Sequence, residues 1–267
     1  MAHFSGQSIV ITGASSGIGR ALTLELAAQK PRLTLAARDK AALDEVAAAA
    51  QARGAETCVV SADVEQAADC RRLIETAQEK FGRIDVLVNN AGRAMWSRFD
   101  ELDDLNVIAD LMRVNYLGSV YTTHFALPHL KRSRGLIVAM ASVSGLIGVP
   151  YLSGYAASKH AVIGFFESLR IELNGSGIDV TILAPDFVRS NILSRAAGPS
   201  GQPLEMSPLD QQSLMSAEAC ARRIVWAMTR RKRLVFTSAR SAYARWGQIL
   251  WPALIDRISA AAVGVRR

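Results

Sequence analysis

The amino-acid sequence predicts a single α/β domain built around a doubly wound parallel sheet. Short β-branched runs alternate along the chain with longer segments whose apolar residues recur at helical spacing, a pattern that predicts right-handed βαβ units. The short runs are apolar almost throughout, as strands are when helices cover both faces of a parallel sheet. The 267 residues are enough for one large domain, and no linker rich in Pro, Gly or Ser interrupts them before residue 187.

This alternation predicts where the strands and helices lie. The strands are expected at Ser8–Thr12, Leu33–Ala37, Thr57–Ser61, Ile84–Asn89, Leu136–Ala141, Ile178–Ala184 and Leu234–Thr237. The helices are expected at Ile18–Gln29, Lys40–Ala52, Ala67–Lys80, Leu105–Leu130 and Gly154–Leu173. Residues 187–213 contain three prolines and two glycines, which predicts a long loop that acts as a lid. We therefore expect a main domain over residues 1–240, lid included, and a helical extension over residues 241–267.

Composition excludes a disordered chain and a disulfide-rich one. Half of the residues are apolar (50%) and 21% are charged, which allows a buried core. The three cysteines are odd in number and share no short spacing, so neither a disulfide framework nor a bound metal is expected. The first seven residues leave no room for a signal peptide. Together with the cysteine usage, this predicts a cytoplasmic protein.

Positive charge is concentrated at the C-terminal end of the chain. The net charge is +7, and residues 189–267 hold 13 Lys and Arg against 4 Asp and Glu. The densest run, Arg230–Arg233, is interpreted as a solvated turn between a helix and a strand. No aromatic residues interleave with these charges, and no nucleic-acid-binding signature is present, so we expect no nucleic-acid partner.

A glycine-rich turn between the first strand and the first helix predicts a phosphate-binding site. Glycines at 13, 17 and 19 let the chain turn tightly and let a backbone approach a pyrophosphate, which then faces the free N–H groups at the start of the helix. An ordinary turn is the alternative, but the position after the first strand favours phosphate binding. The expected contacts are Gly13, Ser15, Ser16, Gly17, Ile18 and Gly19.

The end of the second predicted strand indicates which dinucleotide binds. An acidic residue there accepts a bond from the ribose 2′-OH, whereas an arginine accommodates a 2′-phosphate. The strand ends at the neutral Ala37, and Arg38 follows directly. Asp39 is the competing residue, but its position before a helical segment is typical of a helix N-cap. The sequence therefore favours NADP(H) over NAD(H).

A tyrosine and a lysine at helical spacing are the candidate reacting groups. Tyr155 and Lys159 lie on one face of a predicted helix, one turn apart. A free tyrosine has a pKa of about 10, and a neighbouring ammonium group would lower that pKa toward neutrality. The alternative is an amphipathic pair that is partly exposed. Tyr151 has no such lysine partner.

Further motifs, in the same order along the chain, resemble those of the short-chain dehydrogenases/reductases. The resemblance covers roughly Ser8 to Thr237. Besides the glycine turn and the Tyr155–Lys159 pair, the matching residues are Asp63-Val64, Asn89-Asn90-Ala91-Gly92, Asn115 and Ser142. The resemblance implies a Rossmann-type domain with a seven-stranded parallel sheet, dependence on NAD(P)(H), and a homodimer or homotetramer.

The resemblance also implies the roles of individual residues. Ser142 would hold the substrate oxygen, Tyr155 would exchange a proton with it, and Lys159 would lower the tyrosine pKa and bind the nicotinamide ribose. Asn115 would position a water molecule that links Lys159 to solvent, which completes a catalytic tetrad. The further cofactor contacts that it implies are Asp63, Val64, Asn89, Ala91, Gly92, Tyr155, Lys159, Pro185, Val188 and Ser190.

Several of these positions also have structural interpretations, and one turn departs from the family pattern. Asn115 could be a buried asparagine at a helix kink, and Asp63 could be the cap of the following helix. Ser142 could be a strand-end cap, and the neighbouring Ser144 could substitute for Ser142 in the site. Where the family usually has Pro-Gly after the sixth strand, this chain has Pro185-Asp186. The backbone and its cofactor contacts can therefore differ at this turn.

Apolar residues predominate among the candidate substrate contacts. The expected walls are Ala94, Met95, Trp96, Leu146, Val149, Tyr151, Ile192 and Leu193. They predict a lipophilic carbonyl compound or alcohol as substrate. Arg93, Arg189 and Arg195 lie nearby in the sequence and leave an anionic tail on that substrate open.

The C-terminal extension combines tryptophans with leucines, isoleucines and flanking arginines over residues 243–258. Its layout resembles the extended tail of 11β-hydroxysteroid dehydrogenase-like members of the same family. An interfacial helix that makes peripheral contact with a membrane is one interpretation. A helix that packs on its own domain or on a second copy of the chain is the other.

The sequence thus predicts an NADP(H)-dependent oxidoreductase that interconverts a lipophilic carbonyl compound and its alcohol by hydride transfer, with Tyr155 as general acid and base. One alternative is an NAD-dependent alcohol dehydrogenase of the same family. Another is a non-catalytic regulator that senses NADP(H). The complete Ser142–Tyr155–Lys159 set argues against the regulator, because a sensor needs the glycine turn but no acid–base group.

Overall fold

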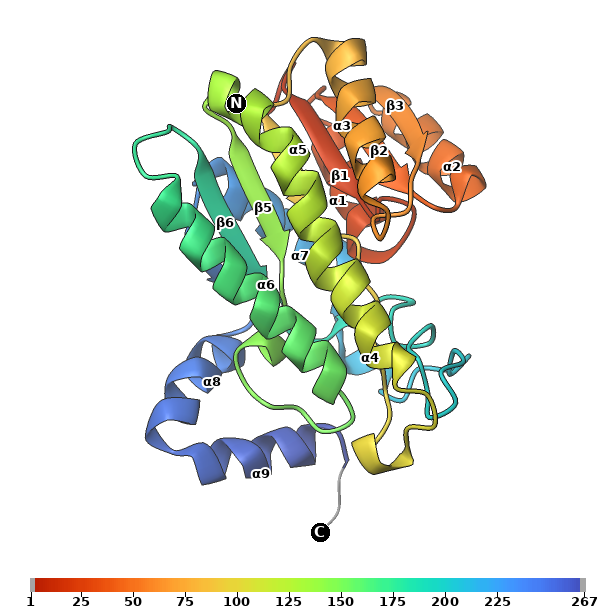
Figure 1. Ribbon diagram of the computed structural model, residues 1–267, viewed down its shortest axis with the longest axis vertical. Coiled ribbons are helices and arrows are strands. Elements are labelled where there is room, and N and C mark those ends of the chain that lie inside the picture. Colours follow the sequence, from red (N-terminus) through yellow and green to blue (C-terminus); the bar gives the residue numbers. More distant parts are fainter. Residues whose placement is uncertain (1–2, 265–267) are drawn as a thin grey trace.

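The computed structural model describes residues 3–264, and its core is a seven-stranded sheet in the order β3-β2-β1-β4-β5-β6-β9 (Figure 1). All neighbouring strands in this sheet run parallel. The strands are β1 (Ser8–Thr12), β2 (Arg32–Ala37), β3 (Glu56–Ser61), β4 (Val86–Asn89), β5 (Leu136–Met140), β6 (Asp179–Ala184) and β9 (Leu234–Phe236). Each of the seven predicted strands is present, with ends that differ by no more than a few residues.

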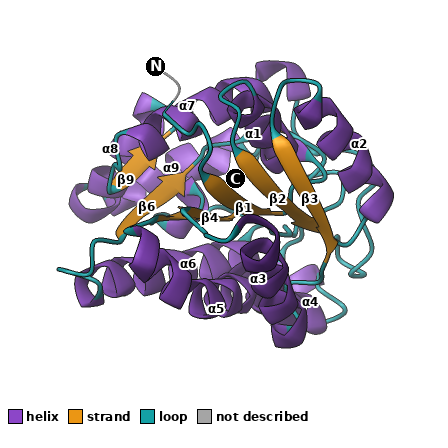
Figure 2. Cartoon of the chain, turned by 90° about the horizontal axis from the view of Figure 1, so that it is seen from above, coloured by secondary structure: helices purple, strands orange, loops and turns teal. Residues whose placement is uncertain are grey.

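Helices cover both faces of the sheet (Figure 2). The helices are α1 (Gly17–Ala27), α2 (Lys40–Gln51), α3 (Ala67–Phe81), α4 (Asn106–Leu111), α5 (Gly118–Ser133), α6 (Ser153–Glu172), α7 (Ala217–Thr229), α8 (Ala239–Leu250) and α9 (Pro252–Ala262). α1, α2 and α7 pack on one face, where Leu22 and Leu35 are fully buried, and α3, α5 and α6 pack on the other, with Ile137 and Phe166. Burial on both sides explains the continuous apolar runs and confirms the predicted fold class.

The order of the strands creates a crevice at the carboxyl ends of the central strands. β1 pairs with both β2 and β4. The helix that follows β1 packs on one face of the sheet, and the long helix that follows β4 packs on the other. The two connections therefore diverge at the carboxyl ends of β1 and β4. Ligands of open α/β sheets bind at such a switch point.

The single helix predicted over Leu105–Leu130 is divided in the structure. α4 and α5 are joined by a π-helical turn, Met112–Leu117, and α5 continues past Pro128 to Ser133. π-turns are rare and occur frequently at functional sites. The basic run Arg230–Arg233 lies between the end of α7 and the start of β9, which confirms the predicted turn.

Residues 187–213 are mostly irregular and are tied to the body of the protein by short pairings. β7 (Val188–Arg189) pairs with β8 (Met215–Ser216), and a bridge joins Met95 to Ala197. The Ala197 N–H donates to the Ala94 carbonyl at 3.0 Å, and its own carbonyl accepts from Trp96 at 2.8 Å. The segment is therefore joined by direct backbone pairings to β8 and to the residues that follow β4.

The C-terminal extension consists of two helices instead of one. α8 already begins at Ala239, and the chain turns at Trp251 so that Pro252 can begin α9. Residues 265–267 of the predicted extension lie outside the described residues. Both helices lie beyond the carboxyl ends of the strands (Figure 1). Over residues 3–264, no helix combines the length and the apolar character needed to cross a bilayer.

Candidate active site

A cavity of about 830 Å³ opens at the carboxyl ends of the central strands, a size typical of cofactor and substrate sites. It brings together residues that lie far apart in the sequence. The sequence-predicted residues that line it are Gly13, Ser15, Ser16, Gly17, Ile18, Gly19, Arg38, Asp63, Val64, Ala91, Gly92, Ser142, Tyr155, Lys159, Pro185, Val188 and Ser190. Among the predicted catalytic and cofactor-binding residues, Asn89 and Asn115 do not line it.

The tight packing of the glycine turn leaves no room for side chains at Gly13 and Gly19. A Cβ on Gly13 would lie 2.8 Å from the Ala91 Cα, and a Cβ on Gly19 would lie 2.2 Å from the Gly13 carbonyl oxygen. Gly13 and Gly17 also have positive φ angles, 66° and 54°. At the start of α1 the N-cap residue, Ser16, makes no side-chain capping bond. The first N–H groups of α1 therefore lack a side-chain cap and suit an anion.

Asn90, which follows β4, holds the glycine turn against the neighbouring strand. Its Nδ2 donates to the carbonyls of Thr12 and Gly13 at 2.9 and 3.1 Å. The Thr12 Oγ1 accepts from the backbone N–H groups of Asn90 and Ala91, both at 3.0 Å. These bonds fix the spacing between the ends of β1 and β4, a role that was not predicted for Asn90 or Thr12 from the sequence.

Asn89, a predicted cofactor contact, faces away from the cavity. It is buried, its Nδ2 donates to the Thr123 Oγ1 at 2.8 Å, and its Oδ1 accepts from the Thr122 Oγ1 at 2.5 Å. Successive strand residues point to opposite faces, so Asn89 lies behind the sheet, on the side of α5. The Asn89 side chain therefore has a structural place behind the sheet, and the cofactor contact expected of this residue stays a prediction.

Arg38 and Asp39 have the separate positions that the sequence indicated. Arg38 is exposed at the end of β2 and lines the cavity. Asp39 is the N-cap of α2, where its carboxylate accepts from the Ala42 N–H at 3.0 Å. The structure confirms this capping role. Asp63, which follows β3, also lines the cavity, and its Oδ1 accepts from the Glu65 N–H at 3.1 Å.

Ser142, Tyr155 and Lys159 meet on the floor of the cavity. Ser142 follows β5, and Tyr155 and Lys159 lie one turn apart on α6. The Lys159 Nζ donates to the Met140 carbonyl at the end of β5, at 2.8 Å, and lies 5.6 Å from the centre of the Tyr155 ring. A Cβ on Gly145 would lie 2.7 Å from the Lys159 carbonyl. The segment after Ser142 thus packs closely on α6.

Burial controls the protonation of both side chains. It raises the pKa of Tyr155 to about 12, although a hydrogen bond with the Ser142 side chain lowers it in part. It lowers the pKa of Lys159 to about 8. The expected lowering of the tyrosine pKa by the ammonium group is therefore not found, because removal of the phenolate from water outweighs the favourable contacts. Near neutrality Tyr155 is a neutral phenol that can donate a proton.

Asn115 lies in the π-turn, behind the cavity wall. Its Oδ1 accepts from the Arg93 N–H at 2.8 Å, and its Nδ2 donates to the Arg93 carbonyl at 3.0 Å and to the Ser158 Oγ at 2.9 Å. A Cβ on Gly92 would lie 3.1 Å from the Asn115 Oδ1 and 3.6 Å from the Lys159 Nζ. Asn115 therefore holds the backbone of Arg93 in place, and Gly92 lies close to the side chains of both Asn115 and Lys159.

The residues that line the substrate end of the cavity are only partly those that were predicted. Ala94, Ile192 and Leu193 line it as predicted, and Leu152, Phe187 and Pro203 line it without having been predicted. Five predicted walls do not: Met95, Trp96, Leu146, Val149 and Tyr151. Met95 is fully buried, and the Trp96 and Tyr151 rings stack on each other with centres 5.4 Å apart. Arg93 and Arg195 also line the cavity, whereas Arg189 does not.

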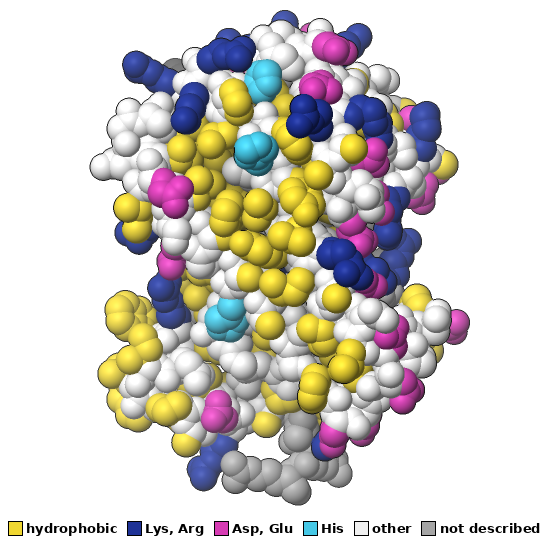
Figure 3. Space-filling model, viewed as in Figure 1, with side chains coloured by type: hydrophobic (Ala, Val, Ile, Leu, Met, Phe, Trp, Pro, Cys, Tyr) yellow, Lys and Arg dark blue, Asp and Glu magenta, His cyan; other side chains and the backbone are white. Residues whose placement is uncertain are grey.

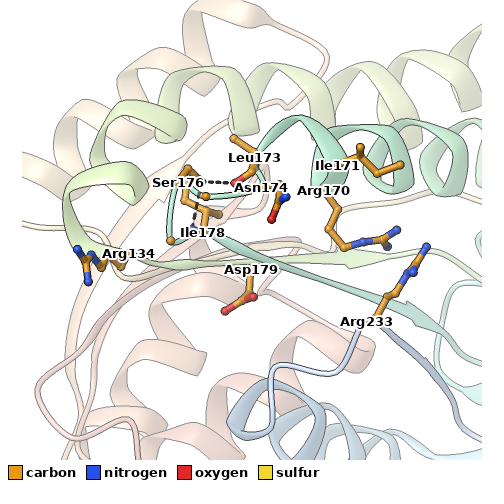
Figure 4. A pocket seen from close by; sticks show the side chains of 11 residues that line it. Arg134, Arg170, Ile171, Leu173, Asn174, Ser176, Ile178, Asp179 and Arg233 are labelled. Atoms are coloured by element: carbon orange, nitrogen blue, oxygen red, sulfur yellow. Dashed lines mark hydrogen bonds between the residues drawn. The ribbon is translucent and has the colours of Figure 1, made fainter.

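A second hollow, of about 780 Å³, lies at the opposite, amino-terminal end of the strands, where β6 and β9 begin (Figure 4). The arginines Arg134, Arg170 and Arg233 and the loop after α6 surround it. None of the predicted catalytic or cofactor residues lines this hollow. The candidate active site is therefore the cavity at the carboxyl ends of the strands.

Comparisons with known proteins agree with this geometry. The profile described as short chain dehydrogenase matches residues 7–198. The 11-beta-hydroxysteroid dehydrogenase A of Sesamum indicum is 37% identical over 258 residues, which cover 94% of this chain and 74% of that protein. The 11-beta-hydroxysteroid dehydrogenase 1A of Arabidopsis thaliana is 39% identical over 259 residues, with coverage of 94% and 74%.

Solved structures show the same likeness. A short chain dehydrogenase/reductase from Burkholderia phymatum in complex with NAD has a TM-score of 0.85 and 29% identity, covering 95% of this chain and 96% of that one. An alcohol dehydrogenase from Thermococcus sibiricus complexed with 5-hydroxy-NADP has a TM-score of 0.75 and 27% identity, covering 87% and 96%. The chain therefore belongs to the short-chain dehydrogenase/reductase family of oxidoreductases, and within it to the 11β-hydroxysteroid dehydrogenase-like type.

Proposed function

We propose that this protein is an NADP(H)-dependent oxidoreductase that reduces a lipophilic carbonyl compound to its alcohol. The observation that supports this most directly is the meeting of Ser142, Tyr155 and Lys159 in the same cavity as the glycine turn. The donor set fits the cofactor, because the N-terminus of α1 can hold a pyrophosphate and the close backbone approach at Gly13 and Gly19 leaves room for it. NADP(H), when bound, would supply or accept the hydride.

Ser142 and Tyr155 are the residues proposed to handle the substrate oxygen. The Ser142 side chain lies near enough to the phenol of Tyr155 to lower its pKa in part, so we propose that both reach one oxygen atom. A phenol whose pKa is about 12 keeps its proton near neutrality, and it can therefore donate that proton to a carbonyl oxygen that becomes an alkoxide. Lys159 supports the site from behind, where it bonds the Met140 carbonyl. We assign Asn115 a positioning role.

We propose NADP(H) as the cofactor because of Arg38. It lies at the end of β2 on the cavity rim, and the neighbouring carboxylate of Asp39 is engaged at the start of α2. A guanidinium group in this place can bind a 2′-phosphate, which an acidic residue would repel. The likeness to a family member solved with NAD keeps an NAD-dependent alcohol dehydrogenase as the second candidate.

The substrate is proposed to be lipophilic because the cavity beyond Tyr155 has apolar walls. Leu152, Phe187, Ile192 and Leu193 line this part. The curated relatives named 11-beta-hydroxysteroid dehydrogenases are similar over 94% of the chain, and a steroid ketone fits the same requirement. Arg93 and Arg195 lie at the same end and would suit an acidic group on such a substrate.

A homodimer or homotetramer is the proposed assembly, with a second copy covering α5 and α6. Apolar side chains gather along these helices in Figure 3. Phe125, Leu127 and Phe165 remain partly exposed there, and Ile171 is 69% exposed. Burial of these side chains against a second copy would remove this apolar area from water.

We further propose that the extension beyond residue 240 rests on a membrane surface. Apolar side chains of α8 and α9 point into solvent. They are Tyr243, Trp246, Ile249, Leu250, Trp251, Leu254 and Ile258, which are 44% to 76% exposed. Aromatic and aliphatic side chains flanked by arginines are typical of helices that lie in the interface of a bilayer. Both helices lie at the carboxyl end of the sheet, where the cavity opens, so a lipophilic substrate could enter the cavity from the membrane surface.

Replacement of Tyr155 tests the proposed chemistry. We expect Tyr155→Phe to slow NADPH oxidation in the presence of lipophilic ketones by roughly 10²-fold or more, because the general acid is lost. NADPH binding, measured by calorimetry, should persist. Tyr151→Phe is the matched control and should keep its activity. Turnover near the unchanged rate in the Tyr155 variant would contradict the assignment, and binding without turnover in the unchanged protein would favour the sensor.

Replacement of Arg38 tests the choice of cofactor. We expect Arg38→Ala to raise KM for NADPH roughly tenfold to a hundredfold, since a charge-assisted bond to a phosphate contributes about 1.5–3 kcal/mol. KM for NADH should change little. Lys40→Ala, which removes a neighbouring exposed charge, is the control. Equal changes for both cofactors would show that Arg38 does not read the 2′-phosphate.

The lowered pKa of Lys159 predicts a pH-dependent stability. Between pH about 8 and 10.5 the unfolded chain keeps the lysine proton that the folded protein has lost. Stability from this group therefore rises with pH across that window. From pH 7.5 to 10, the unfolding free energy of the unchanged protein should gain about 2 kcal/mol relative to Lys159→Met. Urea unfolding of both proteins measures this gain, and a constant difference would refute the buried ammonium group.

The proposed membrane contact can be measured by co-sedimentation with vesicles that contain anionic phospholipid. We expect the unchanged protein to pellet with them and the Trp246→Ala/Trp251→Ala double variant to stay in the supernatant, because two interfacial anchors are lost. Trp226→Ala is the control, since Trp226 is 43% exposed on α7. Pelleting that does not depend on Trp246 and Trp251 would reject this surface.

A further inference from the structure

Asp186 occupies the turn after β6, on the wall of the cavity. The usual family residue there is glycine, yet the Asp186 backbone does not have a positive φ, so this chain has no need of a glycine. The Asp186 N–H donates to the Thr237 Oγ1 at 2.9 Å, and the Asp186 Oδ1 accepts from the Phe187 N–H at 2.9 Å. The first bond connects the turn after β6 with the residue that follows β9, and the second lies within the turn.

The other carboxylate oxygen of Asp186 reaches the start of α8. The Asp186 Oδ2 accepts from the Ser238 Oγ at 3.1 Å and from the Ser241 Oγ at 3.2 Å. Ser238 is the N-cap of α8, where its Oγ also accepts from the Ser241 N–H at 3.1 Å. Ser241 is almost fully buried, with 1% exposure. A carboxylate is favoured at this end of a helix by the unpaired N–H groups and the helix dipole.

Asp186 thus has the cofactor cavity on one side and the C-terminal extension on the other. Pro185, Phe187 and Val188, its neighbours in sequence, all line the cavity. α8 is also joined to α6, the helix of Tyr155, by an ion pair of 3.6 Å between Arg245 and Glu167. A shift of α8 would therefore act on the turn after β6 through a set of direct bonds.

α8 is held in place by close packing against α9. Its crossing with α9 is tight, because a Cβ on Gly247 would lie 2.6 Å from the Ile255 Cδ1. The two helices therefore behave as one packed unit, attached to the cavity wall at the Asp186 end.

We propose that Asp186 is a positioning residue that couples the cofactor cavity to the C-terminal extension. By binding Ser238 and Ser241, it holds the Pro185–Val188 wall in the shape that receives NADP(H). Coupling of this kind is reciprocal, so bound NADP(H) also orders the start of α8. This inference rests on the proposed function, namely on NADP(H) as the ligand of the cavity. A simple helix cap would stabilise α8 without any effect on the cofactor.

The test compares Asp186→Asn with the Ser238→Ala/Ser241→Ala double variant, in which Asp186 itself is intact. We expect both to raise the Kd for NADPH by roughly fivefold or more, with the larger change in KM for NADPH and the smaller one in kcat. Ser216→Ala is the control, because it removes the N-cap bond of α7, 3.1 Å from its Oγ to the Ala219 N–H, outside the cavity. The control should keep the Kd.

Hydrogen exchange supplies a readout that a structural role would not move. NADPH should slow amide exchange over residues 238–250 of the unchanged protein, and this response should be lost in both test variants. Lower melting temperatures with an unchanged Kd and an unchanged exchange response would overturn the proposal and leave Asp186 as a cap. If the unchanged protein bound neither NADPH nor NADH, the proposed function would fail first, and the coupling with it.

Discussion

The site depends on one buried hydrogen bond, from the Lys159 ammonium group to the Met140 carbonyl. This bond joins α6 to the end of β5 at 2.8 Å, and it satisfies a charge that is only 4% exposed. An unpaired ammonium group in this place would cost several kcal/mol. Because Tyr155 is one turn away on the same helix and Ser142 follows the same strand, the bond also sets the distance between the two groups that we propose to handle the substrate oxygen.

Removal of water is the dominant electrostatic effect around that bond. It raises the pKa of Tyr155 and lowers the pKa of Lys159, so both groups are shifted toward their neutral forms. A protein that needed phenolate at neutral pH would require a stronger favourable partner for it than the Ser142 hydroxyl. A neutral phenol beside an apolar pocket suits the delivery of a proton to a carbonyl oxygen, which is the direction that we propose for the reaction.

The other end of the cavity is shaped by the absence of side chains and by contacts between distant segments. Gly13 and Gly19 allow the first turn to lie against Ala91 and the backbone of Gly13 itself, and Asn90 holds that turn in place. On the far side, Asp186 joins the cavity wall to α8. The cofactor site and the C-terminal extension are thus parts of one bonded arrangement, and a lipid surface under α8 and α9 would act close to the same wall.

The sequence alone determined the features that depend on local spacing and backbone conformation. Alternating apolar runs predict the strands and helices, three glycines predict the first turn, and four-residue spacing places Tyr155 and Lys159 on one helix face, as found. Tertiary structure alone decided what depends on residues far apart in the chain. In the folded protein Asn89 bonds Thr122, and Asn90 holds the glycine turn. Trp96 stacks on Tyr151 outside the cavity, and burial raises the pKa of Tyr155. Asp186 bonds partners that are more than fifty residues away in the sequence. Side-chain orientation and loss of water are set by whichever segments pack together, and no local pattern contains that information.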